Sequence, residues 1–150
     1  MKRLLVLFFL FMLLFVLNVN SDLTLFDVFA DDAQSFYIIS GLGVDDNSLN
    51  FSGNNYVSMI NKSDVKTKNY AAKNISGQSV FMGDKNKDFV IKKLNLNLVQ
   101  ESSCGSVKEV LGYTHKFKNY VLVNGQKVNV QISESDVGII VGYPLILQGF

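Results

Sequence analysis

The chain has 150 residues, of which 48% are hydrophobic, and it carries a formal net charge of +1 at pH 7. This near-neutral balance argues against a protein that binds nucleic acid or an anionic membrane through its bulk charge. A single cysteine, Cys104, excludes an intrachain disulfide and a cysteine-based metal site.

The N-terminus has the pattern of an export signal. A short basic start at residues 1–3 precedes a continuous apolar run at residues 4–17, and a small-residue cleavage motif ends at Ala30. The apolar run falls short of the roughly 20 residues that span a bilayer. We therefore expect residues 1–30 to form a signal peptide, or alternatively an uncleaved N-terminal membrane anchor. Residues 31–150 should then form a single domain, secreted or membrane-anchored, outside the cytoplasm.

The first half of this domain has the weaker patterns. Residues 20–34 are mixed and acidic, which is typical of a linker, and residues 35–39 are a short apolar run that predicts a strand. Residues 49–60 alternate around a Gly-Asn-Asn turn and indicate a hairpin. A helix is expected over residues 64–75, where the sequence Ser76-Gly77 would end it.

The second half begins with a helix. Residues 85–94 carry an apolar stripe with lysines on the other faces, and Asp84 is the expected N-cap. Residues 96–99 then predict a strand, and the polar residues 101–105 predict a turn. Residues 106–114 form the strand that leads into the best-defined stretch of the chain.

Asn124-Gly125 lies between two alternating runs and is the strongest hairpin signal in the sequence. Both residues tolerate the positive φ that a tight two-residue turn requires. The hairpin is therefore predicted to extend over residues 117–132. The turn sets the following residues opposite one another: Val121 and Val128, Asn119 and Val130, and Phe117 and Ile132.

The two strands of this hairpin agree on which face is apolar, and that agreement fixes their register. The apolar face consists of Phe117, Val121, Val123, Val128, Val130 and Ile132. A slip by one residue would turn β-branched side chains to water, and each buried apolar side chain contributes about 1.5–3 kcal/mol. The opposite face is the candidate interaction face, and it consists of Lys118, Tyr120, Leu122, Lys127, Asn129 and Gln131.

The chain closes with another turn and strand. Residues 133–136 are polar and predict a turn, whereas residues 137–141 are apolar on both faces and predict an interior strand. Pro144 lacks an N–H group and should end that ladder. Residues 84–150 are the best-defined part of the chain. The patterns together predict an α+β fold, a curved antiparallel sheet with one or two helices packed on one face.

No pattern in the sequence assembles a catalytic or metal site, and no cofactor is expected. His115 is the only histidine and has no evident carboxylate or nucleophile beside it, and Cys104 lies in a Ser/Gly-rich stretch. Asp84, Asn86 and Asp88 imitate the start of a calcium loop, but the glycine and glutamate that complete such a loop are absent. An envelope enzyme that uses His115 or Cys104 stays open as an alternative.

The C-terminal part is similar to a known family. The likeness is carried by Tyr113-Thr114, by the strand Lys127-Val-Asn-Val-Gln-Ile132 and by Val141-Gly-Tyr-Pro144. These motifs resemble the YwmB family of exported Firmicute proteins, whose domain is described as TATA-box-binding-protein-like. The resemblance implies a TATA-box-binding-protein-like half and no catalytic residues. Fold likeness alone does not imply DNA binding.

One functional hypothesis leads, and two alternatives stand beside it. We expect an exported, non-enzymatic protein of YwmB type, in the cell envelope or associated with sporulation, that binds an envelope protein or ligand. A nucleic-acid-binding module is the first alternative, and its motive is the fold that the family resemblance implies. Lys118, Tyr120 and Lys127 on the polar face of the hairpin are compatible with it. The near-neutral charge and the export pattern argue against nucleic acid. The second alternative is the enzyme, and the membrane is a partner if the N-terminal segment stays uncleaved.

Overall fold

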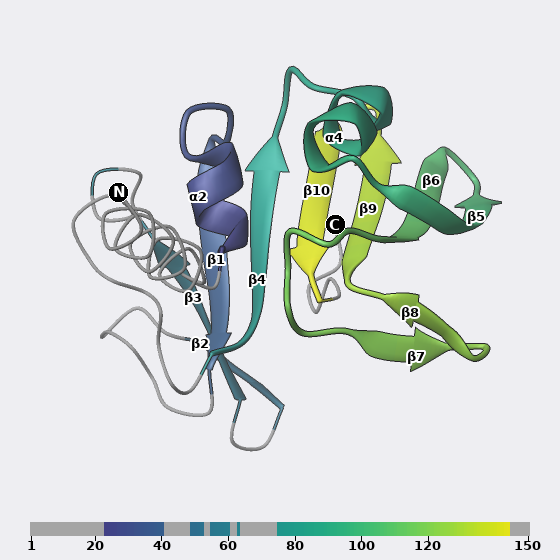
Figure 1. Cartoon of the computed structure of the whole chain (residues 1–150). Helices are drawn as coiled ribbons and strands as arrows, with labels where there is room; N and C mark the ends of the chain where they lie inside the picture. The colour runs from purple at the N-terminus through teal and green to yellow at the C-terminus, as the bar shows by residue number, and fades with distance from the viewer. Residues whose placement is uncertain (1–22, 41–48, 53–54, 61–62, 64–74, 145–150) are drawn as a thin grey trace, which may run out of the picture.

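Two helices and ten strands make up the part of the chain that the structure describes. The computed structural model describes residues 23–40, 49–52, 55–60, 63 and 75–144 (Figure 1). In chain order the elements are α2 (Leu25–Phe29), β1 (Ser35–Ser40), β2 (Leu49–Ser52), β3 (Asn55–Ile60), β4 (Ile75–Met82), α4 (Lys87–Leu94), β5 (Asn97–Cys104), β6 (Val107–Tyr113), β7 (Val121–Val123), β8 (Gln126–Val128), β9 (Val130–Ser135) and β10 (Gly138–Tyr143).

Eight of these strands form one sheet in the order β2-β3-β1-β4-β10-β9-β6-β5, and β7 and β8 form a separate two-stranded sheet. Neighbouring strands pair antiparallel throughout. The large sheet stays open, with β2 and β5 at its two edges. The predicted α+β fold with an antiparallel sheet is therefore confirmed.

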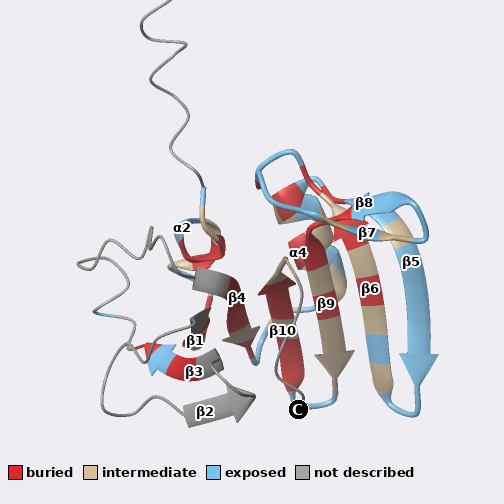
Figure 2. Ribbon diagram, turned by 90° about the horizontal axis from the view of Figure 1, so that it is seen from below, coloured by how far each residue is buried: buried red, intermediate tan, exposed pale blue. Residues whose placement is uncertain are grey.

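A row of buried side chains crosses the large sheet and carries its core. The row consists of Ile60, Phe36, Val80, Val141, Ile132 and Val110, each opposite the next on the neighbouring strand. All are buried, and burial of each contributes about 1.5–3 kcal/mol. Both helices and the β7–β8 hairpin lie over this face of the sheet (Figure 2). The other face of the sheet carries no described helix.

Helix α2 lies where the sequence predicted only a linker. The Thr24 hydroxyl accepts the N–H of Asp27 at 3.1 Å, and the Asp27 carboxylate accepts the N–H of Thr24 at 2.8 Å. This reciprocal pair is a capping box, which satisfies donors at the helix start. The helix buries Leu25, Phe26 and Phe29 against the sheet. The linker predicted from the acidic residues of this stretch is therefore wrong over residues 25–29, which form a short helix that belongs to the core.

Helix α4 confirms the predicted helix, with its start two residues later than expected. The side chain of Asn86, not that of Asp84, caps it by accepting the N–H of Phe89 at 3.0 Å. Val90 and Leu94 are buried on its inner face. The helix ends at Leu94, and its C-cap is Asn95, whose left-handed φ of 49° suits asparagine better than most residues.

The first half of the domain confirms two predictions and corrects one. The strand expected over residues 35–39 is β1, and the hairpin expected over residues 49–60 is β2 paired with β3. Most of the helix expected over residues 64–75 lies outside the described residues. Ile75, however, begins β4, and Ser76-Gly77 lies inside that strand instead of ending a helix. Strand β4 pairs on both sides, with β1 and β10, so tertiary pairing overrides the local turn signal.

The second half has longer strands than the sequence predicted. The turn expected at residues 101–105 is mostly strand, because β5 continues to Cys104 and the chain turns at Gly105, with φ of 62°. The turn expected at residues 133–136 is likewise strand as far as Ser135. Strand β5 is an exposed edge strand, so its polar residues face water as turn residues do. The interior strand ending before Pro144 is confirmed as β10.

Candidate interaction surface

The Asn-Gly turn forms as predicted. Asn124 and Gly125 have φ of 50° and 80°, the values of a tight hairpin turn. Val121 lies opposite Val128, which is the predicted register. The hairpin is shorter than expected, because Val130 and Ile132 belong to β9 of the large sheet. There they pair with residues of β6, and Ile132 also pairs with Val141 of β10. Pairing on both sides buries these side chains more fully than a two-stranded ribbon would.

Asn129 does not lie on an interaction face, contrary to the prediction from alternation. Its side chain is fully buried at the residue that separates β8 from β9. Its Oδ1 accepts the N–H of Thr114 at 2.8 Å, and its Nδ2 donates to the carbonyls of Thr114 at 2.8 Å and Phe117 at 3.2 Å. The chain changes direction between the two sheets at this residue, so strict alternation fails there. Asn129 is a structural residue that fixes the base of the hairpin.

Gln131 is also separated from the hairpin. It lies on β9, opposite Leu111 of β6, and it is half-buried. Its side-chain amide donates a hydrogen bond to Glu109 on β6. The residue therefore belongs to the face of the large sheet away from the helices, and the predicted candidate face is divided between two surfaces.

Of the remaining four residues, Tyr120, Leu122 and Lys127 lie together at the hairpin, and Lys118 precedes them in the segment that leads into β7. We call these four exposed residues the hairpin patch: Lys118, Tyr120, Leu122 and Lys127. All four are exposed, with exposed fractions of 45% for Tyr120 and 66% for Leu122. Leu122 lies directly opposite Lys127 in the hairpin register. The Lys127 ammonium lies 4.5 Å from the centre of the Tyr120 ring. The patch therefore combines large apolar groups with cations at one end of the molecule.

Two further aromatic residues join the hairpin patch, and the sequence did not single them out together. Tyr113 packs edge-to-face against Tyr120, with ring centres 6.4 Å apart, and against His115, with ring centres 5.1 Å apart. Tyr113 ends β6, whereas Tyr120 lies just before β7, so only the fold brings them together. These contacts hold the Tyr120 ring in place.

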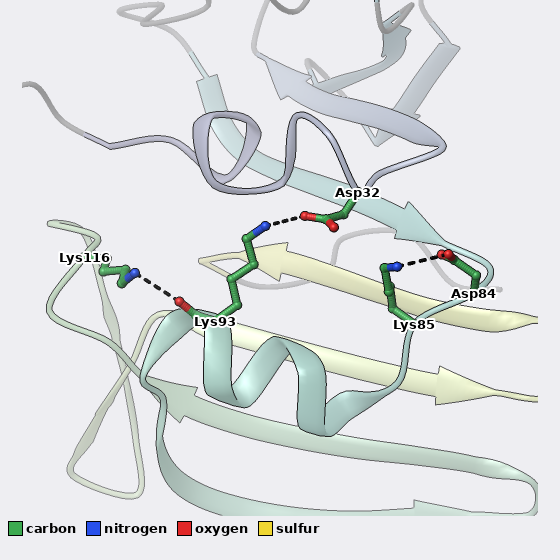
Figure 3. A network of polar contacts seen from close by, with 5 residues as sticks. All are labelled: Asp32, Asp84, Lys85, Lys93 and Lys116. Atoms are coloured by element: carbon green, nitrogen blue, oxygen red, sulfur yellow. Dashed lines mark hydrogen bonds and ion pairs between the residues drawn. The ribbon is translucent and has the colours of Figure 1, made fainter.

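The segment before the hairpin is bound to the end of α4. The Thr114 hydroxyl donates to the carbonyl of Leu94 at 2.7 Å. The Lys116 ammonium donates to the carbonyl of Lys93 at 3.0 Å (Figure 3). The last carbonyls of a helix have no partner within the helix. The segment therefore completes α4 and is itself fixed to the core.

Phe117 gives this segment an apolar anchor. Its side chain is 2% exposed, and the centre of its ring lies 4.5 Å from the ring centre of Tyr143 on β10. The Tyr143 hydroxyl accepts the N–H of Asn119 at 3.1 Å. The contacts of Phe117 and Asn119, on either side of Lys118, therefore fix the segment that leads into β7. This segment holds the hairpin patch in place relative to the core.

Lys93 connects the two halves of the molecule. Its ammonium forms an ion pair with Asp32, which follows α2 (Figure 3). The same ammonium lies 5.4 Å from the ring centres of both Phe29 and Phe89. These contacts place the positive charge of Lys93 between α2 and α4, apart from the hairpin patch.

His115 and Cys104 do not meet in one site. Cys104 lies opposite Val107 at one end of the β5–β6 pair, and His115 follows Tyr113 at the other end. Strands rise about 3.3 Å per residue, so the two ends are separated by roughly 20 Å. Both side chains are exposed. In the part of the chain described here, no group of three or more His, Cys, Asp or Glu side chains is placed to hold a metal ion.

A polar pocket of about 660 Å³ lies where the loop before α4 meets β6, β9 and the start of β10. Its lining mixes lysines with carboxylates. Asp84 pairs with Lys85 at 3.1 Å, and Glu134 accepts the N–H of Lys87 at 3.0 Å in the first turn of α4. The lining therefore carries charges of both signs, so the pocket presents no field of one sign to a ligand.

Comparison with known proteins finds no family model, no curated protein and no solved structure that matches the chain. Within the described ranges, none of the helices has the length and apolar character needed to cross a bilayer.

Proposed function

We propose that the protein is an exported, non-enzymatic interaction module of YwmB type, in the cell envelope or associated with sporulation, that contacts its target through the hairpin patch. The resemblance in the C-terminal motifs and the basic and apolar N-terminal segment support this setting. The hairpin patch supplies the contact surface.

The observation that carries the proposal is the exposure of Leu122 and Tyr120 on a braced support. Leu122 is 66% exposed although burial of a leucine contributes about 1.5–3 kcal/mol. The hairpin is held by Asn129, Phe117 and the end of α4, so the patch has a fixed shape before a partner arrives. Preorganisation of this kind lowers the entropy lost on binding.

The role of the hairpin can be tested by site-specific photo-crosslinking in the cells that produce the protein. A photoreactive amino acid is placed at position 122 of the full chain, or at position 137 as a control. Val137 is a matched control because it is 67% exposed and lies in a turn away from the hairpin. Light-dependent adducts should form at position 122 and not at position 137. Equal labelling at both positions, or none at position 122, would rule out the hairpin as the contact surface.

The proposed location of the domain outside the cytoplasm is tested by a separate experiment. Protease added to intact cells after removal of the wall should digest the domain, because an exported domain is accessible from outside. A protein that is protected until the cells are lysed would contradict export, whatever the crosslinking result.

A further inference from the structure

We propose that the hairpin patch docks on the surface of an anionic lipid bilayer. This inference rests on the proposed function, because it names the target class of the same surface. Leu122 and Tyr120 would enter the interface between headgroups and acyl chains, and the neighbouring lysines would contact lipid phosphates.

The charge distribution favours an anionic surface, although the net charge of +1 predicted little attraction to one. Between Val110 and Ser133 the chain contains Lys116, Lys118 and Lys127 and neither aspartate nor glutamate. The carboxylates of the adjoining strands are engaged elsewhere: Glu109 accepts from the Gln131 amide, and Glu134 accepts from the start of α4. Among the described residues, the segment that carries the hairpin is therefore basic, and a small net charge hides this local excess.

The arrangement of the side chains is that of an interfacial segment. Leu122 and Lys127 are cross-strand neighbours, so an aliphatic group and an ammonium project side by side. Lysine can extend its ammonium to the headgroups while its stem lies along apolar surface. Tyr120 adds a ring with a polar end, the kind of side chain that is enriched at membrane interfaces.

The same geometry disfavours single-stranded nucleic acid as the occupant. Bases bind such surfaces by stacking on open aromatic faces. The Tyr120 ring already has the Lys127 ammonium 4.5 Å from its centre and Tyr113 packed against it. The most exposed group of the patch, Leu122, is aliphatic and offers neither a stacking plane nor a hydrogen bond.

The expected binding is weak, reversible and sensitive to salt. Each lysine near an anionic bilayer contributes about a fivefold gain in binding, so Lys118 and Lys127 of the hairpin patch together favour anionic over neutral lipid by about 25-fold. The contribution decreases within a Debye length, about 8 Å at physiological ionic strength, and it should therefore fall as salt is raised.

The test reads the environment of position 122 in the full chain, so that a membrane-bound N-terminal segment cannot produce the signal. Cys104 is replaced by serine, and a polarity-sensitive dye is attached to Leu122→Cys or to the control Val137→Cys. Each protein is reconstituted with vesicles of phosphatidylcholine alone or of equal parts phosphatidylcholine and phosphatidylglycerol. A blue shift of the dye and its quenching by lipid-bound nitroxide are expected only at position 122 and only in anionic vesicles. The double variant Lys118→Gln/Lys127→Gln should reduce the response by at least about tenfold.

Three results would overturn the lipid inference. They are the same dye emission at position 122 in neutral and anionic vesicles, an equal response at position 137, and a larger response to a single-stranded oligonucleotide than to vesicles. If position 122 nevertheless crosslinks to a protein in cells, the proposed function stands and only the lipid target is wrong. If neither lipid nor protein reaches position 122, both proposals are wrong.

Discussion

Asn129 lies at the junction between the β7–β8 hairpin and the large sheet, and its hydrogen bonds fix that junction. Its buried amide satisfies the N–H and the carbonyl of Thr114 and the carbonyl of Phe117, and its backbone N–H donates to Gly112 at 3.0 Å. No apolar side chain of similar size can replace these bonds. Each buried polar group left without a partner costs roughly 1–3 kcal/mol.

Replacement of Asn129 by alanine should therefore lower the free energy of unfolding by about 3 kcal/mol, which urea titration can measure. Hydrogen exchange should also show earlier opening of residues 114–128 than of the large sheet, because the lost bonds fix the base of the hairpin. Gln126→Ala, at an exposed position of β8, is the control and should change stability by less than about 0.5 kcal/mol. Equal stability of the two variants would show that the amide bonds contribute little.

Gly138 is a second residue whose replacement should be costly. Its φ is 139°, and a Cβ atom there would lie 2.7 Å from the carbonyl oxygen of Met82 and 2.8 Å from Cα of Gly83. Gly138→Ala should lower the free energy of unfolding by at least about 2 kcal/mol, because the backbone must move. Gly105→Ala is the matched control: its φ is 62° but the space around it is open. That control should lose only about 1 kcal/mol, and a larger loss there than at Gly138 would contradict the steric argument.

At the scale of elements, the sequence predicted the helix and the turn that form because of interactions between nearby residues. The Asn124-Gly125 turn and α4 follow from nearby residues: positive φ in the turn, and an apolar stripe with a capping side chain in the helix. The boundaries of β5 and β9 depend on pairing with other strands, so their polar residues predict turns when the sequence is considered alone. Helix α2 is only five residues long, which is too short for a helical hydrophobic periodicity to be recognised. Its one local sequence signal is the capping box of Thr24 and Asp27.

The residues of the candidate interaction face were likewise predicted correctly only where local alternation determines which way a side chain faces. Tyr120, Leu122 and Lys127 lie within the hairpin itself, and alternation placed them correctly on one exposed face. Asn129 and Gln131 come after the hairpin leaves its own register, where alternation no longer reports which surface a side chain faces. The contact between Tyr113 and Tyr120 spans two elements and has no local signal.

The start of α4 carries a pH-dependent contact. A hydrogen bond from the Lys87 ammonium to Glu101 on β5 raises the pKa of Lys87 above its ordinary value of 10.5. The fold then favours the protonated lysine, so the contribution is complete below pH 10.5 and is lost as the pH rises through the raised value. Because the pair lies at the surface, the contribution to stability is small.

The shift itself can be measured by NMR titration of the Lys87 side chain. Glu101→Gln should lower the pKa of Lys87 toward its ordinary value, since the neutral amide no longer favours the charged lysine. Glu109→Gln is the control, because Glu109 bonds to Gln131 and Ser102 instead. An unchanged Lys87 pKa in the Glu101 variant would show that another group causes the shift.

At the scale of the whole molecule, β4 and β10 join two halves of different connectivity. Residues of the second half form a meander in the order β5-β6-β9-β10, whereas the first half has the order β2-β3-β1-β4. The described halves are therefore not two copies of one strand order. The buried row that crosses both halves and the ion pair of Lys93 with Asp32 show that they share one core.

This shared core limits where the proposed export signal could be cleaved. Cleavage after Ala30 would take away α2, whose Leu25, Phe26 and Phe29 are at most 3% exposed. It would also remove the buried N–H of Leu25 that donates to Gln78 at 2.9 Å. Loss of three such side chains costs roughly 5–9 kcal/mol, which is comparable with the whole stability of a domain. A mature chain that begins at Asp31 would therefore not keep this fold.

If the N-terminal segment is cleaved, we expect the cut upstream of Thr24. Val19 and Ser21 supply small residues two positions apart, shortly after the apolar run ends at residue 17. Intact mass and N-terminal sequencing of the protein recovered from culture medium should then give Asp22 as the first residue. Replacement of Ser21 by arginine should block this processing, whereas Ala30→Leu should leave it unchanged, because Ala30 lies beyond the helix that the domain needs. Recovery of a folded protein that starts at Asp31 would contradict the role of α2 in the core.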